Sequence, residues 1–436
     1  MRTRLLALFT AALLLTPAVS QSGEADHGFT IAVIPDTQNY LDYTHQKSEG
    51  FPFDASELFL AQMRYVAANA ISAGGDIAFL TALGDVWQHQ SLAIDPAHAA
   101  RGFKRVANPF LDGHFAPTAR TQDFEMPLAR KGYAFIDGKM PFAVVPGNHD
   151  HDAMWTDANH PPAATFTGLS SLGMLHAGGT SNFVSVFGAE SDFFRGKNWY
   201  VDSFAGGADS AQVFEAGGYR FLHIGLQFDA PDSALAWASG VVKRHAGLPT
   251  IVTIHGYLNN EGERAANPML DNSAIDPEDN SPQMVWDEFI SQHDQIFLVL
   301  CGHHHGQSRR VDANRFGHSV HQVLADYQDR AQTLIRAGRT PERGEGVGDG
   351  WLRLMRFDMS AEPPRIEVKT VSTHYGRNSS ELPEYAAWYR AAEKPAMDDA
   401  GFLAQDAFTL ELGDFRKRFG RPAGPSPAAS AGVDVR

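Results

Sequence analysis

Five apolar runs in this chain each end in side chains that can bind a metal ion. The runs are rich in Val, Ile, Leu, Ala and Phe, which is typical of buried β-strands. The polar residues at their ends are Asp36 with Gln38, Asp85, Asn148 with His149, His255, and His303 with His305. Catalytic groups in α/β folds gather at the carboxyl ends of strands. We therefore expect these residues to meet at one edge of a sheet.

The segments around the first two runs predict a parallel βαβ unit. Residues 29–34 and 77–83 have the composition of strands, and apolar residues recur at helical spacing over 59–70. A capping-box pattern at Asp54 predicts the start of this helix, and Gly74 predicts its end. Strand, helix and strand in this order favour a parallel sheet.

The rest of the chain alternates strands with long irregular segments, which predicts an α/β (α+β) fold. Strands are expected over 141–145, 211–216, 219–227, 250–254, 296–301, 319–324, 351–357, 365–371 and 408–412, and helices over 233–245 and 283–293. Two long loop insertions, 86–140 and 151–196, are expected to lie over the active face, because loops of this length usually carry function. We divide the chain into a main domain over 28–375, a C-terminal extension over 376–420 and a disordered tail over 421–436.

The N-terminus predicts export. Arg2 and Arg4 precede the apolar run 5–15, and small residues before Gln21 form a cleavage site, so residues 1–20 are interpreted as a signal peptide. An uncleaved membrane anchor is the alternative. After cleavage no stable membrane anchor is expected, which places the protein in the periplasm or the medium. The chain has one cysteine, Cys301, so a disulfide within the chain is excluded.

The chain is strongly acidic, with a formal net charge of −15. Signal cleavage would remove two arginines and no acidic residue, which lowers the charge to about −17. Such a surface repels nucleic-acid backbones, so no long nucleic acid is expected as a partner. An anionic substrate would then need a local positive charge, and bound metal ions are one source of it.

The residue types at the strand ends suit a site for two divalent metals. A carboxylate can bridge two cations, while imidazole nitrogens and amide oxygens complete the coordination without adding charge. Two metals about 3.5–4 Å apart can hold a hydroxide and clamp a phosphoryl group for in-line attack. Each motif taken singly could be a turn, a helix cap or a surface loop. Their joint occurrence after five apolar strands carries the prediction.

The series Asp-x-Gln, Gly-Asp, Gly-Asn-His-Asp, His and Gly-His-x-His resembles the motif set of calcineurin-like metallophosphoesterases, over about residues 29–371. The branch it resembles most is the exported bacterial one whose first motif is Asp-Thr-Gln. This resemblance implies a two-sheet β-sandwich flanked by helices, with a binuclear metal site at the strand carboxyl ends. It also implies that His149 donates a proton to the leaving oxygen. The implied ligands are Asp36, Gln38, Asp85 and His305 for one metal, and Asp85, Asn148, His255 and His303 for the other.

Two positions depart from the common family pattern. Gln38 stands where His is usual, and its neutral, harder amide oxygen favours Mn²⁺ or Fe²⁺ over Zn²⁺, or weakens the first metal. Gln88 stands where relatives place a ligating Tyr or an acid that orients the motif histidine. We therefore expect Asp150 or a loop group to orient His149.

The sequence thus predicts an exported metal-dependent hydrolase, a metallophosphoesterase that cleaves a phosphodiester or monoester in a small phosphorylated substrate. Two divalent ions (Mn, Fe or Zn) are the expected cofactors, and His149 and Asp150 the expected catalytic residues. An exported protein that binds metal or phosphate with little turnover is the alternative, favoured by Gln38 and Gln88. An exported nuclease is a weaker third hypothesis. The oligomeric state is not predicted.

Overall fold

The computed structural model describes residues 28–114, 118–341 and 345–421. The predicted signal peptide over 1–20, and the predicted tail beyond residue 421, lie outside the described residues. In the described part of the chain, no helix is both long enough and apolar enough to cross a bilayer.

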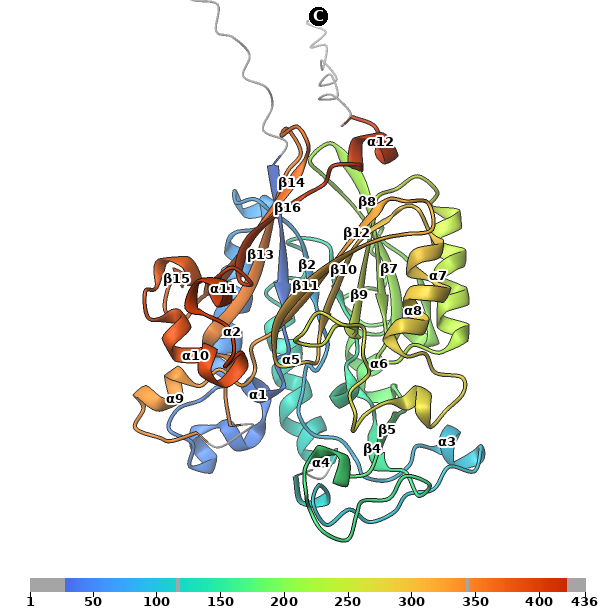
Figure 1. Ribbon diagram of the computed structural model, residues 1–436, viewed down its shortest axis with the longest axis vertical. Helices are drawn as coiled ribbons and strands as arrows, with labels where there is room; N and C mark the ends of the chain where they lie inside the picture. The colour runs from blue at the N-terminus through green and yellow to red at the C-terminus, as the bar shows by residue number, and fades with distance from the viewer. Residues whose placement is uncertain (1–27, 115–117, 342–344, 422–436) are drawn as a thin grey trace, which may run out of the picture.

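The first sheet is mixed and, within the described ranges, has seven strands (Figure 1). Its order is β15 (Arg377–Asn378), β14 (Arg365–Ser372), β13 (Trp351–Asp358), β1 (Gly28–Ile34), β2 (Ile77–Ala82) and β3 (Phe142–Val144), with β16 (Ala407–Glu411) also paired to β14. The central pairs β1–β2 and β2–β3 are parallel, as the βαβ pattern predicted. The pairs β1–β13, β13–β14 and β14–β16 are antiparallel.

The second sheet also has seven strands among the residues described. Its order is β11 (Gly306–Ala313), β12 (Ser319–Asp326), β10 (Ile296–Gly302), β9 (Thr250–Gly256), β8 (Tyr219–Leu226), β7 (Asp209–Ala216) and β6 (Tyr200–Phe204). Strands β8, β9, β10 and β12 are parallel to one another. The predicted hairpin joins β7 and β8 through Gly217 and Gly218, both with positive φ, as a tight two-residue turn requires.

The two sheets pack face to face and enclose a core rich in phenylalanine. Phe29 of β1 lies 5.4 Å from Phe221 of β8, and Phe79 of β2 stacks on Phe214 of β7 at 4.4 Å between ring centroids. These side chains are at most 3% exposed. The two-sheet arrangement implied by the family resemblance is therefore present as a packed sandwich.

Helices cover the outer faces of both sheets (Figure 1). Helices α2 (Ser56–Ala68) and α5 (Met126–Tyr133) pack on the first sheet, and α7 (Asp232–Arg244) and α8 (Pro282–Glu288) pack on the second. The other α-helices of the described residues are α1 (Gln38–Leu41), α3 (Pro96–Ala100), α4 (Thr118–Arg120), α6 (Ser181–Phe187), α9 (Gln332–Arg336), α10 (Tyr385–Glu393), α11 (Asp399–Leu403) and α12 (Phe415–Phe419).

Two helix boundaries differ from the prediction. Helix α2 follows Ala55, because the carboxylate of Asp54 accepts the backbone N–H of Lys47 at 2.7 Å instead of capping the helix. It ends at Ala68, and Gly74 ends a separate 3-10 turn. Likewise α8 ends at Glu288 and continues as a short 3-10 turn, which is shorter than the predicted helix over 283–293.

The two long insertions contain more regular structure than their sequences predicted. Residues 86–140 hold α3, α4 and α5, while 151–196 hold α6 and a hairpin of β4 (Ala153–Thr156) and β5 (Leu175–Gly178). These segments are too short to show a helical or strand period, and tertiary contacts specify them. In Figure 1, α3, α4, β4 and β5 lie together beyond the lower end of the sandwich.

Candidate metal centre

The predicted ligands come together where β1, β2, β3, β9 and β10 end. We call the seven residues that form this group the strand-end cluster: Asp36, Gln38, Asp85, Asn148, His255, His303 and His305. Two of them have left-handed backbone, Asp85 with φ 48° and His303 with φ 70°. Non-glycine residues rarely adopt this conformation, and it concentrates at functional sites.

Glycines let the chain segments approach one another at this point. A Cβ on Gly147 would lie 2.1 Å from Oδ1 of Asp85, and a Cβ on Gly302 would lie 2.1 Å from Oδ1 of Asp36. A methyl group at either position would therefore push a carboxylate out of place. The glycines of the Gly-Asn and Gly-His motifs are therefore required for steric reasons, in addition to the polar residues that follow them.

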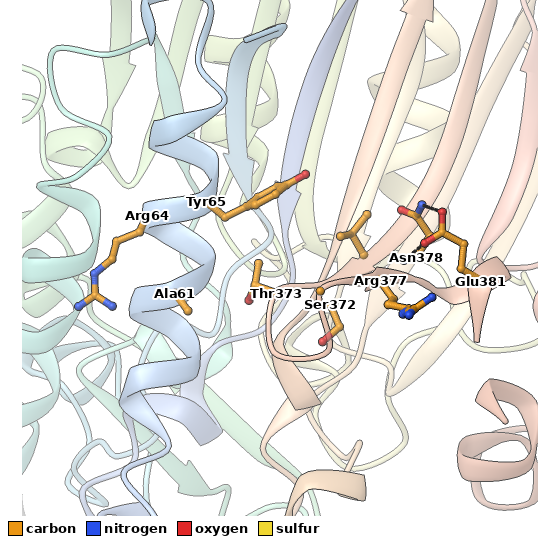
Figure 2. Close-up of a pocket in the computed structure, with 10 residues that line it drawn as sticks. Ala61, Arg64, Tyr65, Ser372, Thr373, Arg377, Asn378 and Glu381 are labelled. Atoms are coloured by element: carbon orange, nitrogen blue, oxygen red, sulfur yellow. Dashed lines mark hydrogen bonds between the residues drawn. The ribbon is translucent and has the colours of Figure 1, made fainter. Parts of the chain in front are cut away.

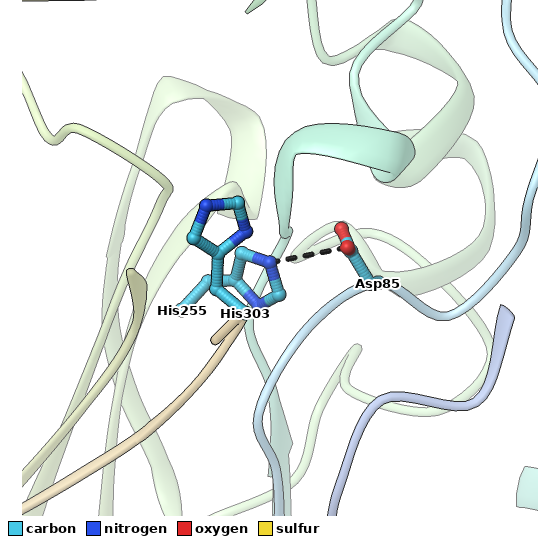
Figure 3. Close-up of side chains that lie close together, drawn as sticks. All are labelled: Asp85, His255 and His303. Atoms are coloured by element: carbon cyan, nitrogen blue, oxygen red, sulfur yellow. Dashed lines mark ion pairs between the residues drawn. The ribbon is translucent and has the colours of Figure 1, made fainter. Parts of the chain in front are cut away.

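Asp85, His255 and His303 form the centre of the cluster (Figure 3). One potential ligand atom from each lies within 4.8 Å of the other two. Nε2 of His255 is 3.2 Å from Oδ2 of Asp85, and its Nδ1 lies 2.8 Å from the carbonyl oxygen of Leu83. A carbonyl oxygen can only accept a hydrogen bond, so Nδ1 of His255 must carry the proton. In the neutral ring this leaves the lone pair of Nε2 available to a metal.

Asn148, Gln38 and Asp36 surround this centre. Oδ1 of Asn148 lies 3.2 Å from Nε2 of His255, and the amide of Gln38 donates to Oδ2 of Asp85 at 3.2 Å. Oδ2 of Asp36 accepts the backbone N–H of His303 at 3.0 Å. Asp36 and His255 are buried behind the pocket, whereas Asp85, Gln38, Asn148 and His303 line it.

His305 stands at the edge of the cluster, and its side chain is 42% exposed. Its Nδ1 lies 2.5 Å from a carboxylate oxygen of Asp329, and its Nε2 lies 2.6 Å from the amide nitrogen of Gln328. Neither partner was predicted from the sequence. Both follow β12, whose end has the same apolar-to-polar pattern as the five strands that were identified, so that pattern could have found them.

His149 is held by a main-chain atom, and Asp150 has a different role from the one expected. Nδ1 of His149 lies 2.6 Å from the carbonyl oxygen of Gln88, so the backbone of Gln88 orients the ring. Asp150 is fully buried and accepts the backbone N–H groups of Val86, Trp87 and Gly147 at 2.9–3.3 Å. It joins the loops that carry Asp85 and Asn148. Of the two groups expected to orient His149, Asp150 or a loop group, the structure has the loop group, the Gln88 carbonyl.

The electrostatics of the site are dominated by buried acids. Burial raises the pKa of Asp36 well above its ordinary value, and the charges of Asp326 and Asp85 add to this. Burial also raises the pKa of Asp326 to about 6. Asp85 behaves in the opposite way: burial opposes ionisation, but the charges of His255 and His149 outweigh it and hold the pKa below its usual range.

Several buried oxygens in the site suit a cation. Within the described part of the chain, Oδ1 of Asp36, Oε1 of Gln38 and Oδ2 of Asp326 have no hydrogen-bond partner. Unpartnered buried oxygens carry a free-energy cost that a bound cation removes. Carboxylate and amide oxygens beside imidazole nitrogens suit divalent transition metals. The residues present therefore fit a metal centre, and Asp326 is a buried acid of this site that the sequence analysis missed.

A pocket of about 230 Å³ opens on the cluster and is lined also by Met154, Leu175, Asn267 and Met269. A larger groove of about 670 Å³ shares His303, His305 and Asn267 with it and extends towards Trp388. A further pocket of about 550 Å³, between α2 and the end of β14, is lined by Arg64, Thr373 and Arg377 (Figure 2). No residue of the strand-end cluster is among the described residues that line this further pocket.

The fold and the cluster define a mixed α/β protein with a candidate metal centre at the strand ends. No protein-family model matches the chain. In sequence it is similar to the uncharacterized protein YvnB of Bacillus subtilis (strain 168), with 25% identity over 236 residues. That match covers 52% of this chain but 16% of the relative's own length. In structure it is similar to GAP50, the anchor in the inner membrane complex of Plasmodium, with 12% identity and a TM-score of 0.36 over 80% of this chain and 86% of that one.

Proposed function

We propose that this chain is an exported metal-dependent phosphoesterase, of the calcineurin-like type that its motifs resemble. The observation that carries the proposal is the convergence of Asp36, Gln38, Asp85, Asn148, His255, His303 and His305 from five strand ends, with unpartnered buried oxygens among them. Asp85 is the residue proposed to bridge two divalent ions. Such ions would supply Lewis-acid activation of a phosphoryl group and of water.

The chain's own residues divide the remaining work. Asn148 and His303 line the pocket and position phosphoryl oxygens, while Asp36 and His255 fix the centre from behind. His149 lines the same pocket, and its Nδ1–H is held by the Gln88 carbonyl, so its Nε2 is free to carry the proton for the leaving oxygen. Export to the periplasm or the medium, and a small phosphorylated substrate, remain parts of this proposal.

A charge-removing variant at the bridge tests the proposal. Asp85→Asn keeps the shape of the side chain but removes the charge that holds the cations, and should lower hydrolysis of bis-(p-nitrophenyl) phosphate with Mn²⁺ on the order of 10³-fold. Asp209→Asn is the matched control, because Asp209 is an equally buried acid that bonds to Gln227 in the second sheet. If Asp85→Asn hydrolysed the ester at the wild-type rate, the two-metal mechanism would be wrong.

The second candidate function is metal or phosphate binding without turnover. Gln38 favours it, since an amide in place of an imidazole makes a weaker ligand. Elemental analysis of the purified chain, combined with assays of mono- and bis-(p-nitrophenyl) phosphate, separates the two functions. Metal bound at the strand-end cluster without hydrolysis of either ester would support the binding protein.

A further inference from the structure

A second group of metal-binding side chains lies outside the strand-end cluster, in the insertions beyond the sheet ends. It consists of His98 on α3, His176 on β5, and Asp276 in the loop between η9 (Asn272–Ala274) and α8. One potential ligand atom from each lies within 4.8 Å of the other two. The three residues come from segments 78 and 100 positions apart in the chain. Only tertiary folding brings them together.

His176 is the feature that points to a ligand. Its side chain is 0% exposed, and neither ring nitrogen has a hydrogen-bond partner within the described residues. A buried imidazole with both nitrogens unpartnered is costly, because each nitrogen loses its water without a replacement. Nε2 of His176 lies 3.8 Å from Oδ2 of Asp279, too far for a hydrogen bond.

His98 is oriented as metal-bound histidines usually are. Its Nδ1 lies 2.6 Å from Oδ2 of Asp95, which also caps the start of α3. The carboxylate holds the proton on Nδ1 and leaves the lone pair of Nε2 facing Oδ2 of Asp276 at 3.7 Å. Gly178 permits this pairing, since a Cβ there would lie 2.4 Å from Oδ2 of Asp95.

The separations match a four-coordinate metal ion better than they match direct bonds. Ligand atoms placed about 2.0 Å from a tetrahedral zinc lie about 3.3 Å from one another. The pair His98–Asp276, at 3.7 Å, is slightly wider than this, and the ligand atoms of His98, His176 and Asp276 all lie within 4.8 Å of one another. Arg101 binds both oxygens of Asp276 at 2.6 Å, yet each carboxylate oxygen has two lone pairs, so Oδ2 keeps one for a metal.

The surroundings of His176 are aromatic, and the donor types favour a borderline metal over calcium or magnesium. Trp155 packs 4.8 Å from the ring of His176, and Phe103 packs 5.0 Å from it on another side. A shell of aromatic rings lowers the local dielectric and strengthens ligand bonds. Two imidazoles with carboxylates are a zinc donor set, whereas calcium and magnesium take oxygen ligands.

We propose that His98, His176 and Asp276 form a structural Zn²⁺ site. The site ties α3, the β4–β5 hairpin and the 271–279 loop to one another. Met154 and Leu175 of that hairpin line the pocket of the strand-end cluster, so the zinc fixes one wall of that pocket. This inference does not depend on the proposed phosphoesterase function.

Metal counting tests the proposal. The full chain is saturated with Zn²⁺, dialysed and analysed for bound zinc. His98→Gln is the test variant, since the His98 side chain is 17% exposed on a short surface helix and the change should preserve the fold. The expected result is the loss of one zinc per chain relative to the wild type. His321→Gln is the control: His321 is another buried histidine with an unpartnered nitrogen, on β12, and the variant should lose none.

A second variant, His303→Gln, keeps the test informative if His98→Gln fails to fold. His303→Gln weakens the strand-end cluster and should retain one tightly held Co²⁺ with the strong visible absorption of four-coordinate cobalt. Equal zinc in His98→Gln and the wild type would overturn the proposal, as would weak, six-coordinate absorption from all cobalt in His303→Gln. If His303→Gln lost hydrolysis but kept the four-coordinate cobalt, the phosphoesterase role would lie with the strand-end cluster and the zinc site would be supported.

Discussion

Two buried clusters of charged residues lie on either side of the end of β12. One is the strand-end cluster and the other is a network of arginines and acids, and they differ in how their buried charges are balanced. Asp326 faces the strand-end cluster, where it is close enough to raise the pKa of Asp36. The next residue, Tyr327, points the other way and bonds to Asp406 at 2.9 Å. Alternation along the strand therefore divides two adjacent residues between two clusters.

The second group is an arginine network made of Arg330, Arg353, Asp406, Glu393 and Tyr385. Arg330 bonds to Glu393 at 2.8 and 3.1 Å, and Arg353 bonds to Asp406 at 3.1 Å. Two cations face two acids, so the network is neutral without any outside group. Every nitrogen of the Arg330 guanidinium has a partner.

The strand-end cluster lacks this internal balance. In the described ranges, no arginine or lysine forms an ion pair with Asp36, Asp85 or Asp326, and the side chain that pairs with Asp36 and Asp85 is His255. The comparison teaches that the arginine network is balanced in charge as folded, whereas the acids of the strand-end cluster have no such balance within the described residues. It also explains why a site for divalent cations can exist in a chain with a net charge of −15.

Breaking the arginine network should have the largest effect on stability. Arg330→Met preserves most of the side-chain volume but leaves Glu393 and Asp406 with one cation between them. Removing one partner of a buried pair costs about 3–5 kcal/mol, because the remaining charge stays buried and unpaired. Urea unfolding measures this loss, which should be the same with and without metal.

Arg336→Met is the control for that variant. Arg336 lies on α9, close in sequence, but it is exposed and contacts the rings of Tyr375 and Trp388. Its loss should change the free energy of unfolding by about 0.5 kcal/mol or less. If the two methionine variants were equally stable, the arginine network would not be the balanced element that the comparison assumes.

The strand-end cluster should make the metal-free chain less stable as the pH rises from about 4 to 6. The pKa of Asp326 is raised from 3.8 to about 6, so over this range the unfolded chain ionises there while the folded chain resists. The contribution of Asp326 to folding stability falls through this window by about 3 kcal/mol and is constant beyond it. A bound divalent metal would reverse the loss by holding the charged form.

Urea unfolding in chelator at pH 4, 5 and 6 measures this slope. Asp326→Asn should make it shallower, and the part that remains belongs to other buried acids with raised pKa values, such as Asp36. Asp192→Asn, at an exposed position on the surface, should leave the slope unchanged. The low pKa of Asp85 does not interfere, since its contribution is lost only as the pH falls below about 4. If the free energy of unfolding depended on pH equally in Asp326→Asn and the wild type, ionisation of Asp326 would not destabilise the folded chain.

The sequence was sufficient to predict the strands that carry the strand-end cluster and the ligand types at their ends, because buried parallel strands are continuous apolar runs and polar residues mark where they stop. Asp36, Asp85, Asn148, His255 and His303 were identified in this way, and the structure brings them together. Their roles as metal ligands remain a prediction. Strands β4, β5, β6, β11 and β15 were missed.

What the sequence could not predict depends on contacts between distant segments. Asp326 follows an apolar strand like the others, but its neighbour Tyr327 belongs to another cluster, and a sequence does not show which side each faces. The pairing of His98 with His176 joins two insertions that have no period of their own. The role of Asp150 depends on backbone N–H groups, which have no residue-specific signature in a sequence.

The smallest expected effect concerns Gln88, at the position where the family that the motifs resemble places an acid or a tyrosine. The structure orients His149 through the main-chain carbonyl of Gln88, which any residue at this position supplies. Backbone N–H groups of Gln88 and His89 are in turn held by the buried carboxylate of Glu125, so the loop keeps its place without the Gln88 side chain.

Gln88→Ala should therefore keep hydrolysis within about threefold of the wild type, or about 0.6 kcal/mol of barrier, with an unchanged pH profile. His149→Gln, by contrast, should lower the rate on the order of 10²-fold, because the proton donor itself is lost. Rates on bis-(p-nitrophenyl) phosphate across pH 5–9 compare the two variants. If the hydrolysis rate of Gln88→Ala fell as far as that of His149→Gln, the Gln88 side chain would be acting directly on substrate or metal. The glutamine at this position would then be a specialised residue of the site and not a neutral replacement.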